Sequence, residues 1–327
     1  TYYDGTKILS MNDLDGLKPE IYMITTNRTG GKTTFFGRLF VKKFIEKREK
    51  FALLFRFNYE LENVEEKFFK DIGSLFFRGY TMTSKKISGG IGRELFLHSP
   101  NCDEDDLGES CGYAIALNQS DQVKKNSHLF SDVQRIMFDE FQSESNNYCH
   151  DEITKFQSVH TSIARGQGKQ TRYVPVYMLS NPVSLINPYY VEFGISERLQ
   201  DKTKFLKGHG WVLENGWVES ASKAMLDSGF SRAFASSKYV NFASQQGVYL
   251  NDNSSFIEKP TGSSKYLATI IYNNKEYALK EYFKEGIIYC DDRDDSTFSF
   301  RIAVTTDDHR INYVMLRNND LFIQSMR

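Results

Sequence analysis

The segment Thr26–Thr33 constrains this chain most, because its sequence Thr-Asn-Arg-Thr-Gly-Gly-Lys-Thr lies between two strongly patterned segments. Residues 21–25 have the apolar pattern of a buried strand, and residues 33–50 space their apolar side chains as an amphipathic helix does. A glycine-rich turn between a strand and a helix predicts a phosphate loop. In such a loop the backbone N–H groups surround the phosphates, a lysine reaches the β- and γ-oxygens, and the next hydroxyl binds Mg²⁺.

The loop departs from the usual pattern at its start, where Thr26 stands in place of the first glycine. Gly31 is present and lets the backbone approach a phosphate without an intervening Cβ. The structural alternative is a plain strand–turn–helix with an exposed Lys32. The strand before the loop and the helix after it favour a nucleotide site. Its predicted ATP-binding residues are Asn27, Arg28, Thr29, Gly30, Gly31, Lys32, Thr33 and Thr34.

A second apolar run, residues 133–138, ends in Asp139 and Glu140. An aspartate at the carboxyl end of a parallel strand helps hold Mg²⁺ in phosphate-loop ATPases, so Asp139 is predicted to bind the metal together with Thr33. Hydrolysis also needs a base that orients and deprotonates the attacking water. Glu140 is the candidate base, and its presence favours an ATPase over a nucleotide kinase. The alternative is an acidic N-cap for a following helix.

Ser180 and Asn181 follow the next predicted strand, residues 174–179. In ATPases with an additional central strand, a polar residue at this place contacts the γ-phosphate or the attacking water. Asn181 is therefore the third candidate catalytic group. A turn residue before Pro182 is the alternative interpretation.

Two arginines are candidates for neutralising the charge that develops during phosphoryl transfer. Arg28 lies inside the loop and can act within its own subunit. Arg165 follows a predicted helix, residues 152–164, in a glycine-rich turn, where it is expected to be exposed and able to act on a neighbouring subunit. A solvated helix C-terminus is the alternative for Arg165.

Strands that alternate with helices predict an α/β fold with a mostly parallel sheet in residues 1–200. Residues 201–250 are interpreted as a linker or lid segment that contains a hairpin at Asn215-Gly216. Short strand-like runs follow and indicate a small C-terminal domain, residues 251–327. The length of 327 residues fits two domains.

Charge and cysteine content narrow the range of partners. The 41 basic and 42 acidic residues give a net charge of −1, so any nucleic-acid contact must use a local basic patch. The four cysteines form no C-x₂-C pair, which argues against a zinc site and fits reduced thiols inside a cell. No apolar run approaches the roughly 20 residues that cross a bilayer, and the polar opening lacks the pattern of a signal peptide.

Taken together, these motifs resemble the DNA-packaging ATPases of phi29-type tailed phages, which are small relatives of terminase large subunits. The resemblance is collinear over nearly the whole chain, and its most family-specific part is Ser180–Tyr189. Relatives usually carry glycine where Thr26 and Thr29 stand. The segments that carry the resemblance are Asn27–Thr33, Phe138–Phe141, Leu179–Tyr189, Phe256–Lys259, Ile271–Asn273 and Thr305–Asp308.

The resemblance implies a P-loop ATPase of the ASCE class that uses ATP and Mg²⁺ to pump double-stranded DNA into a viral procapsid. It implies a homo-oligomeric ring, expected to be a pentamer, on the portal of the procapsid, with ATP bound between neighbouring subunits. Arg165 falls where the family has its trans-acting arginine. Phi29-type motors also use a packaging RNA as a partner. The expected location is the host cytoplasm, at the procapsid during assembly, without membrane contact.

The C-terminal part resembles the small α+β RNase-H-like nuclease domain of terminases. Those nucleases place a metal-binding aspartate on their first strand, whereas residues 266–272 contain no carboxylate. Four aspartates between residues 291 and 295 cluster near a strand end but lack that partner. The domain is therefore predicted to be a nuclease relic that binds nucleic acid or a ring neighbour without cutting DNA.

Contacts to DNA are expected mainly at phosphates, because packaging must ignore sequence. The candidate nucleic-acid-binding residues are Arg56, Lys124 and Lys125. Two alternatives to a packaging motor stay open from the sequence. One is another DNA-stimulated, helicase-like ATPase, and the other is a non-catalytic nucleotide-binding scaffold, which the departure at Thr26 permits.

Overall fold

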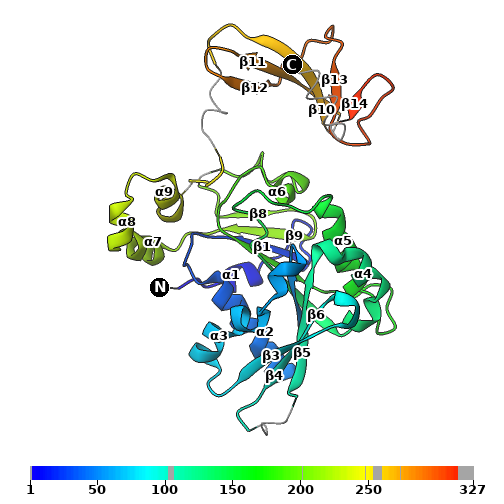
Figure 1. Ribbon diagram of the computed structural model, residues 1–327, viewed down its shortest axis with the longest axis vertical. Helices are drawn as coiled ribbons and strands as arrows, with labels where there is room; N and C mark the ends of the chain where they lie inside the picture. Colours follow the sequence, from blue (N-terminus) through cyan, green and yellow to red (C-terminus); the bar gives the residue numbers. More distant parts are fainter. Residues whose placement is uncertain are drawn as a thin grey trace. The chain divides into compact units, whose positions relative to one another are not determined.

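The computed structural model describes residues 2–101, 107–200, 202–246, 248–252, 260–272 and 274–315. The chain divides into two compact units, Thr1–Asp252 and Asn253–Arg327 (Figure 1). Two parts of the sequence resemblance, Phe256–Lys259 and Asn273, lie outside the described residues. Among the helices of the described segments, none combines the length and the apolar character that a membrane crossing requires.

A nine-stranded sheet forms the centre of the first unit. Its strands are β1 (Ile21–Thr25), β2 (Lys50–Phe55), β3 (Thr81–Lys86), β4 (Gly92–His98), β5 (Glu109–Ala116), β6 (Val133–Asp139), β7 (Val176–Ser180), β8 (Phe205–Lys207) and β9 (Trp211–Asn215). They are arranged in the order β3-β4-β5-β2-β6-β7-β1-β9-β8. The strands from β5 to β9 in this order are parallel, while β3, β4 and β8 pair antiparallel at the edges. The predicted α/β fold with a mostly parallel sheet is confirmed.

Helices cover both faces of this sheet, which explains why its central strands are apolar on both sides. The covering helices are α1 (Thr6–Leu9), α2 (Lys32–Lys47), α3 (Val64–Phe76), α4 (Ser120–Lys125), α5 (Glu152–Ile163) and α6 (Pro188–Glu192). One core, which includes Ile8, Phe40 and Phe68, belongs to α1, α2 and α3. The other core belongs to α4, α5 and α6 and includes Phe156 and Tyr189. Short 3₁₀ helices are η1 (Asn58–Leu61), η2 (Ser88–Gly90), η3 (Leu117–Gln119) and η4 (Ser127–Phe130).

Strand β7 lies between β1 and β6, so the strand before the phosphate loop and the strand that ends in Asp139 are not neighbours. All three strands run parallel, with Thr25 beside Ser180 and Asp139 beside Leu179. Their carboxyl ends therefore lie at one edge of the sheet, where open α/β sheets bind ligands. The arrangement supplies the additional central strand on which the interpretation of Asn181 depends.

The predicted linker is organised differently in the structure. Strands β8 and β9 belong to the main sheet, with β9 parallel to β1 and β8 antiparallel to β9. The hairpin predicted at Asn215-Gly216 is wrong, because the β8–β9 turn lies at residues 208–210 and β9 ends at Asn215. Trp211 and Leu213 are buried, so packing beside β1 outweighs the local turn signal.

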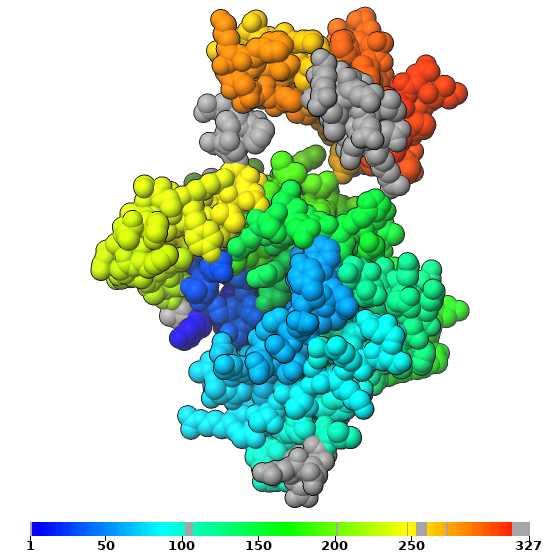
Figure 2. All heavy atoms as spheres, viewed as in Figure 1, coloured from blue at the N-terminus to red at the C-terminus, as the bar shows by residue number. Residues whose placement is uncertain are grey.

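Three short helices complete the first unit. They are α7 (Glu219–Leu226), α8 (Gly229–Ala233) and α9 (Lys238–Ser244). Figure 2 shows them as a yellow lobe that projects from the side of this unit. The lobe follows directly on Val218, which contacts the phosphate loop as described below.

The second unit is a five-stranded sheet in the order β12-β11-β10-β13-β14. Its strands are β10 (Lys265–Tyr272), β11 (Lys275–Tyr282), β12 (Ile287–Asp291), β13 (Arg301–Ala303) and β14 (Val314–Met315). The β10–β11–β12 pairs are antiparallel, whereas β13 and β14 continue parallel to β10. The described part of this unit, residues 260–272 and 274–315, forms strands and no helix, so the helical part of the predicted α+β domain is not found there.

Candidate nucleotide-binding and hydrolysis site

The phosphate loop joins β1 to α2 and contains residues in the left-handed backbone conformation. Gly31 has φ 96°, which glycine adopts readily, and Thr29 has φ 60°, which is uncommon for a β-branched residue. A Cβ at Gly30 would lie 3.1 Å from Val218 Cγ2 and 3.2 Å from the Asn27 carbonyl oxygen. The loop is therefore tightly folded at the start of α2, where backbone N–H groups form an anion-binding concavity.

Asn27 fixes this loop to the segment after β9. Its side chain is buried, with Nδ2 donating to the Val218 carbonyl oxygen at 3.0 Å and Oδ1 accepting from the Val218 N–H at 2.8 Å. The sequence predicted that Asn27 binds the nucleotide. In the structure its side chain holds the loop in place, so a phosphate contact is left to its backbone.

Lys32 is the first residue of α2, and its side chain is buried beside the end of β7. Its Nζ donates to Asn181 Oδ1 at 2.8 Å. Burial lowers the pKa of Lys32, and the negative charges of Asp139 and Glu140 act in the opposite direction. A desolvated cation surrounded by hydrogen-bond donors of a loop favours an anionic ligand, so the predicted phosphate contact fits this position.

Thr33 and Asp139 meet across the sheet edge, as the sequence predicts. The Thr33 hydroxyl donates to Asp139 Oδ2 at 2.8 Å, and the Glu140 N–H donates to Asp139 Oδ1 at 2.9 Å. Burial raises the pKa of Asp139, while the charge of Lys32 and the Thr33 hydroxyl lower it. A partly desolvated carboxylate next to a hydroxyl is a pair of hard oxygen ligands, which is the donor chemistry that Mg²⁺ prefers.

Glu140 follows Asp139 directly and has a left-handed backbone with φ 56°. Removal of water by the surrounding protein raises the pKa of Glu140, and the negative charges of Asp139 and Glu144 add to this effect. A raised pKa makes a carboxylate a stronger base, which suits the predicted activation of water. Glu140 and Glu144 both line a cavity of about 200 Å³, in which a reacting group can be placed.

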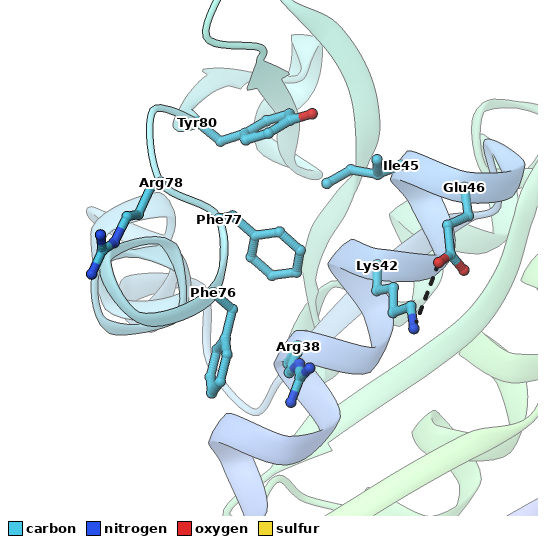
Figure 3. Close-up of a pocket in the computed structure, with 8 residues that line it drawn as sticks. All are labelled: Arg38, Lys42, Ile45, Glu46, Phe76, Phe77, Arg78 and Tyr80. Carbon is cyan, nitrogen blue, oxygen red and sulfur yellow. Dashed lines mark ion pairs between the residues drawn. The ribbon is translucent and has the colours of Figure 1, made fainter.

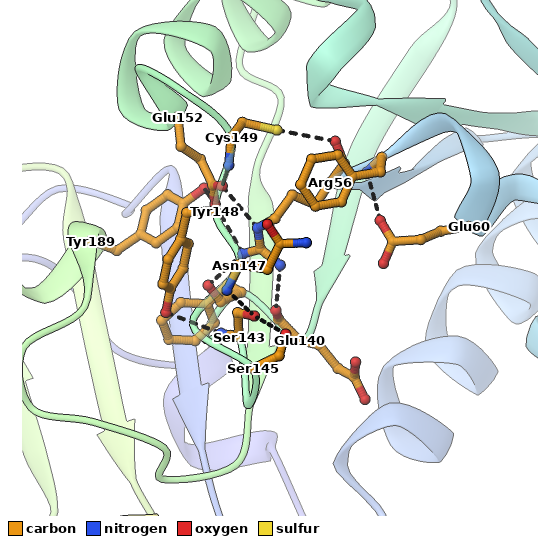
Figure 4. Close-up of polar contacts among 12 residues, drawn as sticks. Arg56, Glu60, Glu140, Ser143, Ser145, Asn147, Tyr148, Cys149, Glu152 and Tyr189 are labelled. Atoms are coloured by element: carbon orange, nitrogen blue, oxygen red, sulfur yellow. Dashed lines mark hydrogen bonds and ion pairs between the residues drawn. The ribbon is translucent and has the colours of Figure 1, made fainter. Parts of the chain in front are cut away.

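Arg56 directly follows β2 and is buried next to Glu140 (Figure 4). Its Nε and Nη2 donate to the two oxygens of Glu152 at 2.8 and 2.9 Å. Nη2 also donates to the Phe141 carbonyl oxygen at 2.8 Å, and Nη1 to that of Glu140 at 3.3 Å. The Arg56 side chain is 6% exposed, and four of its five N–H groups are hydrogen-bonded within the protein, so the structure contradicts the predicted contact of Arg56 with nucleic acid.

Glu152 completes this buried cluster from the start of α5. It also accepts from the Cys149 N–H at 2.8 Å and the Tyr189 hydroxyl at 2.9 Å. The paired charge and hydrogen bonds of the cluster offset the cost of burying both ions. The turn that contains Glu140 is thereby tied to β2, α5 and α6.

Arg28 and Asn181 both contact a carboxylate that the sequence did not single out. Glu144 Oε1 accepts from Arg28 Nη1 at 3.2 Å and from Asn181 Nδ2 at 3.2 Å. Arg28 also donates to the hydroxyl of Tyr239 in α9. Glu144 lies in a polar segment without a motif, and Tyr239 is 211 residues from Arg28, so local patterns could not reveal either residue.

Arg165 lies at the opposite edge of the sheet. The helix α5 starts at Glu152, beside Arg56, and ends at Ile163, whose carbonyl oxygen accepts from Arg172. Arg172 also donates to the carbonyl oxygen of Val133, the first residue of β6. Arg165 itself is exposed. Since β6 spans about 20 Å, Arg165 cannot reach the phosphate loop of its own chain.

Lys124 and Lys125 end α4 and are both exposed. They lie on the face that α4 and α5 cover, and their ammonium groups are available to a phosphate backbone. The structure thus brings Lys32, Thr33, Asp139, Glu140 and Asn181 together, and separates Arg165 and the two lysines from them. Arg56 meets this group through the backbone carbonyl oxygen of Glu140.

An extended groove begins at the phosphate loop. A cavity of about 630 Å³ is lined by loop residues and by Thr34, Tyr2, Phe35 and Phe76. It shares Arg38 and Phe76 with a second cavity of about 390 Å³ between α2 and the segment after α3 (Figure 3). The Arg38 guanidinium lies 4.5 Å from the centre of the Phe76 ring. Apolar and aromatic walls beside a phosphate loop suit the base and ribose of a nucleotide.

The fold and these residues define a phosphate-loop ATPase with an additional central strand. The sequence profile of the podovirus DNA encapsidation protein (Gp16) matches residues 1–324. The chain therefore belongs to the podovirus DNA encapsidation protein family, which confirms the resemblance found in the sequence. The DNA packaging protein of Bacillus phage phi29 is 25% identical over 324 residues, covering 97% of this chain and 86% of that protein.

Two solved structures are similar over almost the whole chain. The bacteriophage Phi-29 viral genome packaging motor assembly has a TM-score of 0.57 at 21% identity, covering 99% of this chain and 91% of that chain. The Phi-28 gp11 DNA packaging motor has a TM-score of 0.59 at 17% identity, covering 99% of this chain and 89% of that chain. These similarities show a shared fold.

Loss of the buried Arg56 should destabilise the protein. We expect Arg56→Ala to lower the free energy of unfolding by about 3–5 kcal/mol, because Glu152 would be left buried without its cation. Arg165→Ala, at an exposed position, is the matched control and should change the free energy of unfolding by less than about 0.5 kcal/mol. Urea denaturation followed by circular dichroism measures both. Equal stability of the two variants would contradict the role assigned to the cluster.

Proposed function

We propose that this protein is an ATP-hydrolysing motor that moves double-stranded DNA into a viral procapsid. The observation that carries this proposal is that Lys32, Thr33, Asp139, Glu140 and Asn181 meet at one sheet edge in a member of a DNA encapsidation family. The similarity to the DNA packaging protein of phi29 and to two packaging motors supports it.

ATP is the proposed substrate, with its phosphates at the loop and its base and ribose in the cavity of about 630 Å³. Lys32 and the backbone of Gly30–Thr33 contact the β- and γ-phosphates. The Thr33 hydroxyl and the Asp139 carboxylate are the groups that would hold Mg²⁺. Mg²⁺ bound there would neutralise charge on the phosphates.

Glu140 is the proposed general base. It takes the proton of the water that attacks the γ-phosphate, and its raised pKa supports this role. The amide of Asn181 lies next to Lys32 and orients the same phosphate or the water. The left-handed turn at Glu140, held from below by Arg56, sets the direction of the base.

Arg165 is the proposed trans-acting arginine of a homo-oligomeric ring, which we expect to be a pentamer. Two observations support this: Arg165 is exposed, and it lies at the sheet edge opposite its own phosphate loop. An arginine in that place can act only on the ATP of a neighbour. ATP would then be hydrolysed only in assembled subunits.

The partners follow from the same proposal. The ring would sit on the portal of a procapsid in the host cytoplasm, with a packaging RNA as a further partner. Double-stranded DNA would be contacted through phosphates, and the exposed Lys124 and Lys125 are the candidates. Arg56 is no longer among them, because its guanidinium is buried.

The second unit is proposed to bind nucleic acid or a ring neighbour without cutting DNA. Strand β10, Lys265–Tyr272, carries no carboxylate. Asp291 is buried at the end of β12, and its carboxylate accepts from Lys280 Nζ at 2.8 Å. This contact lowers the pKa of Asp291 and keeps its charge compensated by protein instead of by a metal. Two-metal cleavage requires several converging carboxylates.

ATP turnover by the protein assembled with procapsids tests the catalytic assignment. Lys32→Ala should nearly abolish turnover because contact with the γ-phosphate is lost, and Glu140→Gln should bind ATP without hydrolysing it. Phosphate release and nucleotide binding are the measurements. Lys70→Ala, an exposed lysine of α3, is the control and should turn over ATP normally. Normal turnover by Glu140→Gln would show that Glu140 is not the base.

Mixing two inactive variants tests the trans role of Arg165. An arginine finger is worth about 10³–10⁵ in rate, so Arg165→Ala should be nearly inactive while it still binds ATP. A Glu140→Gln subunit supplies its intact arginine to an Arg165→Ala neighbour, so mixed assemblies should regain part of the activity. Recovery should rise with protein concentration and with procapsid. Mixed rings that form but show no recovery would exclude the trans role and leave Arg28 as the candidate.

Incubation with supercoiled plasmid tests the absence of nuclease activity. We expect the full chain to leave the plasmid intact in Mg²⁺ or Mn²⁺, because β10 lacks a metal-binding carboxylate. Gel electrophoresis measures nicking. Cleavage that disappears on mutating Asp291 or Asp292 would overturn this part of the proposal.

A further inference from the structure

One carboxylate, that of Glu144, holds two hydrogen-bond donors of the phosphate site. Its Oε1 accepts from Asn181 Nδ2 and from Arg28 Nη1, each at 3.2 Å. Asn181 in turn accepts from Lys32 through its Oδ1 at 2.8 Å. Lys32, Asn181, Glu144 and Arg28 therefore form a continuous polar chain from the end of β7 across the phosphate loop.

The two donors that Glu144 engages are those that a γ-phosphate needs. Asn181 can offer only its Nδ2 to a phosphate oxygen, because its Oδ1 is an acceptor. Arg28 lies inside the loop, and its guanidinium is suited to phosphate oxygens. Glu144 engages one N–H of Asn181 Nδ2 and Nη1 of Arg28, so a γ-phosphate that approaches from the side of Glu144 must compete with this carboxylate for those N–H groups. The β-phosphate is expected at the loop backbone and Lys32, where Glu144 makes no hydrogen bond.

The charge of Glu144 acts in the same direction as this competition. It adds to the negative charges around Lys32 and contributes to raising the pKa of Glu140. The negative charge of Glu144 repels a γ-phosphate that enters beside it. A nucleoside diphosphate has no γ-phosphate at this position and therefore avoids this repulsion.

We propose that Glu144 determines how strongly the site prefers ATP over ADP, because it competes with the γ-phosphate for Asn181 and Arg28. The proposal rests on the proposed function, since it assumes that the loop binds ATP. It assigns to Glu144 a role in nucleotide selectivity and not in the chemical step.

The strength of the contacts fits a competitor that ligand can displace. The side chains of Arg28 and Glu144 are 42% and 36% exposed, and pairs of this kind are weak. Arg28 also contacts Tyr239 of α9 through a hydrogen bond and a cation–π contact at 5.7 Å. The same Arg28 Nη1 contacts Glu144 and Tyr239, so a γ-phosphate that draws this nitrogen away from Glu144 would also act on its contact with α9.

Nucleotide binding by the full chain tests this proposal. Calorimetry in Mg²⁺ would compare ADP with the non-hydrolysable analogue AMP-PNP for the wild type, Glu144→Gln and Glu144→Ala. Both variants should bind AMP-PNP about fivefold more tightly, the factor that an exposed ion pair is worth, and ADP within about twofold of the wild type. Glu62→Gln is the control. It removes an exposed charge from the segment before α3 and should change neither the AMP-PNP affinity nor the ADP affinity.

The outcomes separate this inference from the function on which it rests. Equal gains for ADP and AMP-PNP would overturn it, because Glu144 would then act only through general electrostatics. Weaker or unchanged AMP-PNP binding by both variants would also overturn it. A wild-type protein that binds neither nucleotide would overturn the proposed function and, with it, the role of Glu144. Thermal unfolding of each variant checks that the fold is retained.

Discussion

The parallel pairing of β1, β7 and β6 is the constraint on which the site depends. Because the three strands run in one direction, the polar residues that follow them lie at a single sheet edge. Lys32, in the helix that follows β1, contacts Asn181 after the end of β7. Thr33, in the same helix, contacts Asp139 at the end of β6. The apolar strands and the two helical layers fix these strand ends, and Asn27 ties the phosphate loop to Val218.

The buried pair of Arg56 and Glu152 adds a second constraint beneath the same edge. It ties the left-handed turn at Glu140 to the end of β2 and to the start of α5. The 12-residue helix α5 then runs to the opposite edge and ends just before Arg165. In the proposed ring, α5 would connect the turn of the base Glu140, through Arg56 and Glu152, to the arginine that acts on the ATP of a neighbouring subunit.

Local patterns were sufficient to predict the α/β fold and the residues gathered at the sheet edge. The phosphate loop, Asp139-Glu140 and Asn181 each follow an apolar run directly, so strand ends could be located from the sequence. Contacts made by residues outside these motifs could not be predicted. Arg56 looks like a basic surface residue until Glu152, 96 positions later, is placed beside it. Glu144 and Tyr239 lie in polar segments without a motif. The turn predicted at Asn215-Gly216 does not form, because β9 pairs with β1 instead.

Packaging by assembled procapsids tests the central claim most directly. The protein would be mixed with portal-bearing procapsids, double-stranded DNA and ATP, and the DNA that survives nuclease treatment would be measured. An ATP-driven packaging motor should protect DNA only when ATP is hydrolysed, so protection should be absent without ATP and with the Glu140→Gln variant. Protection that is equal with and without ATP hydrolysis would contradict the assignment of this protein as the motor.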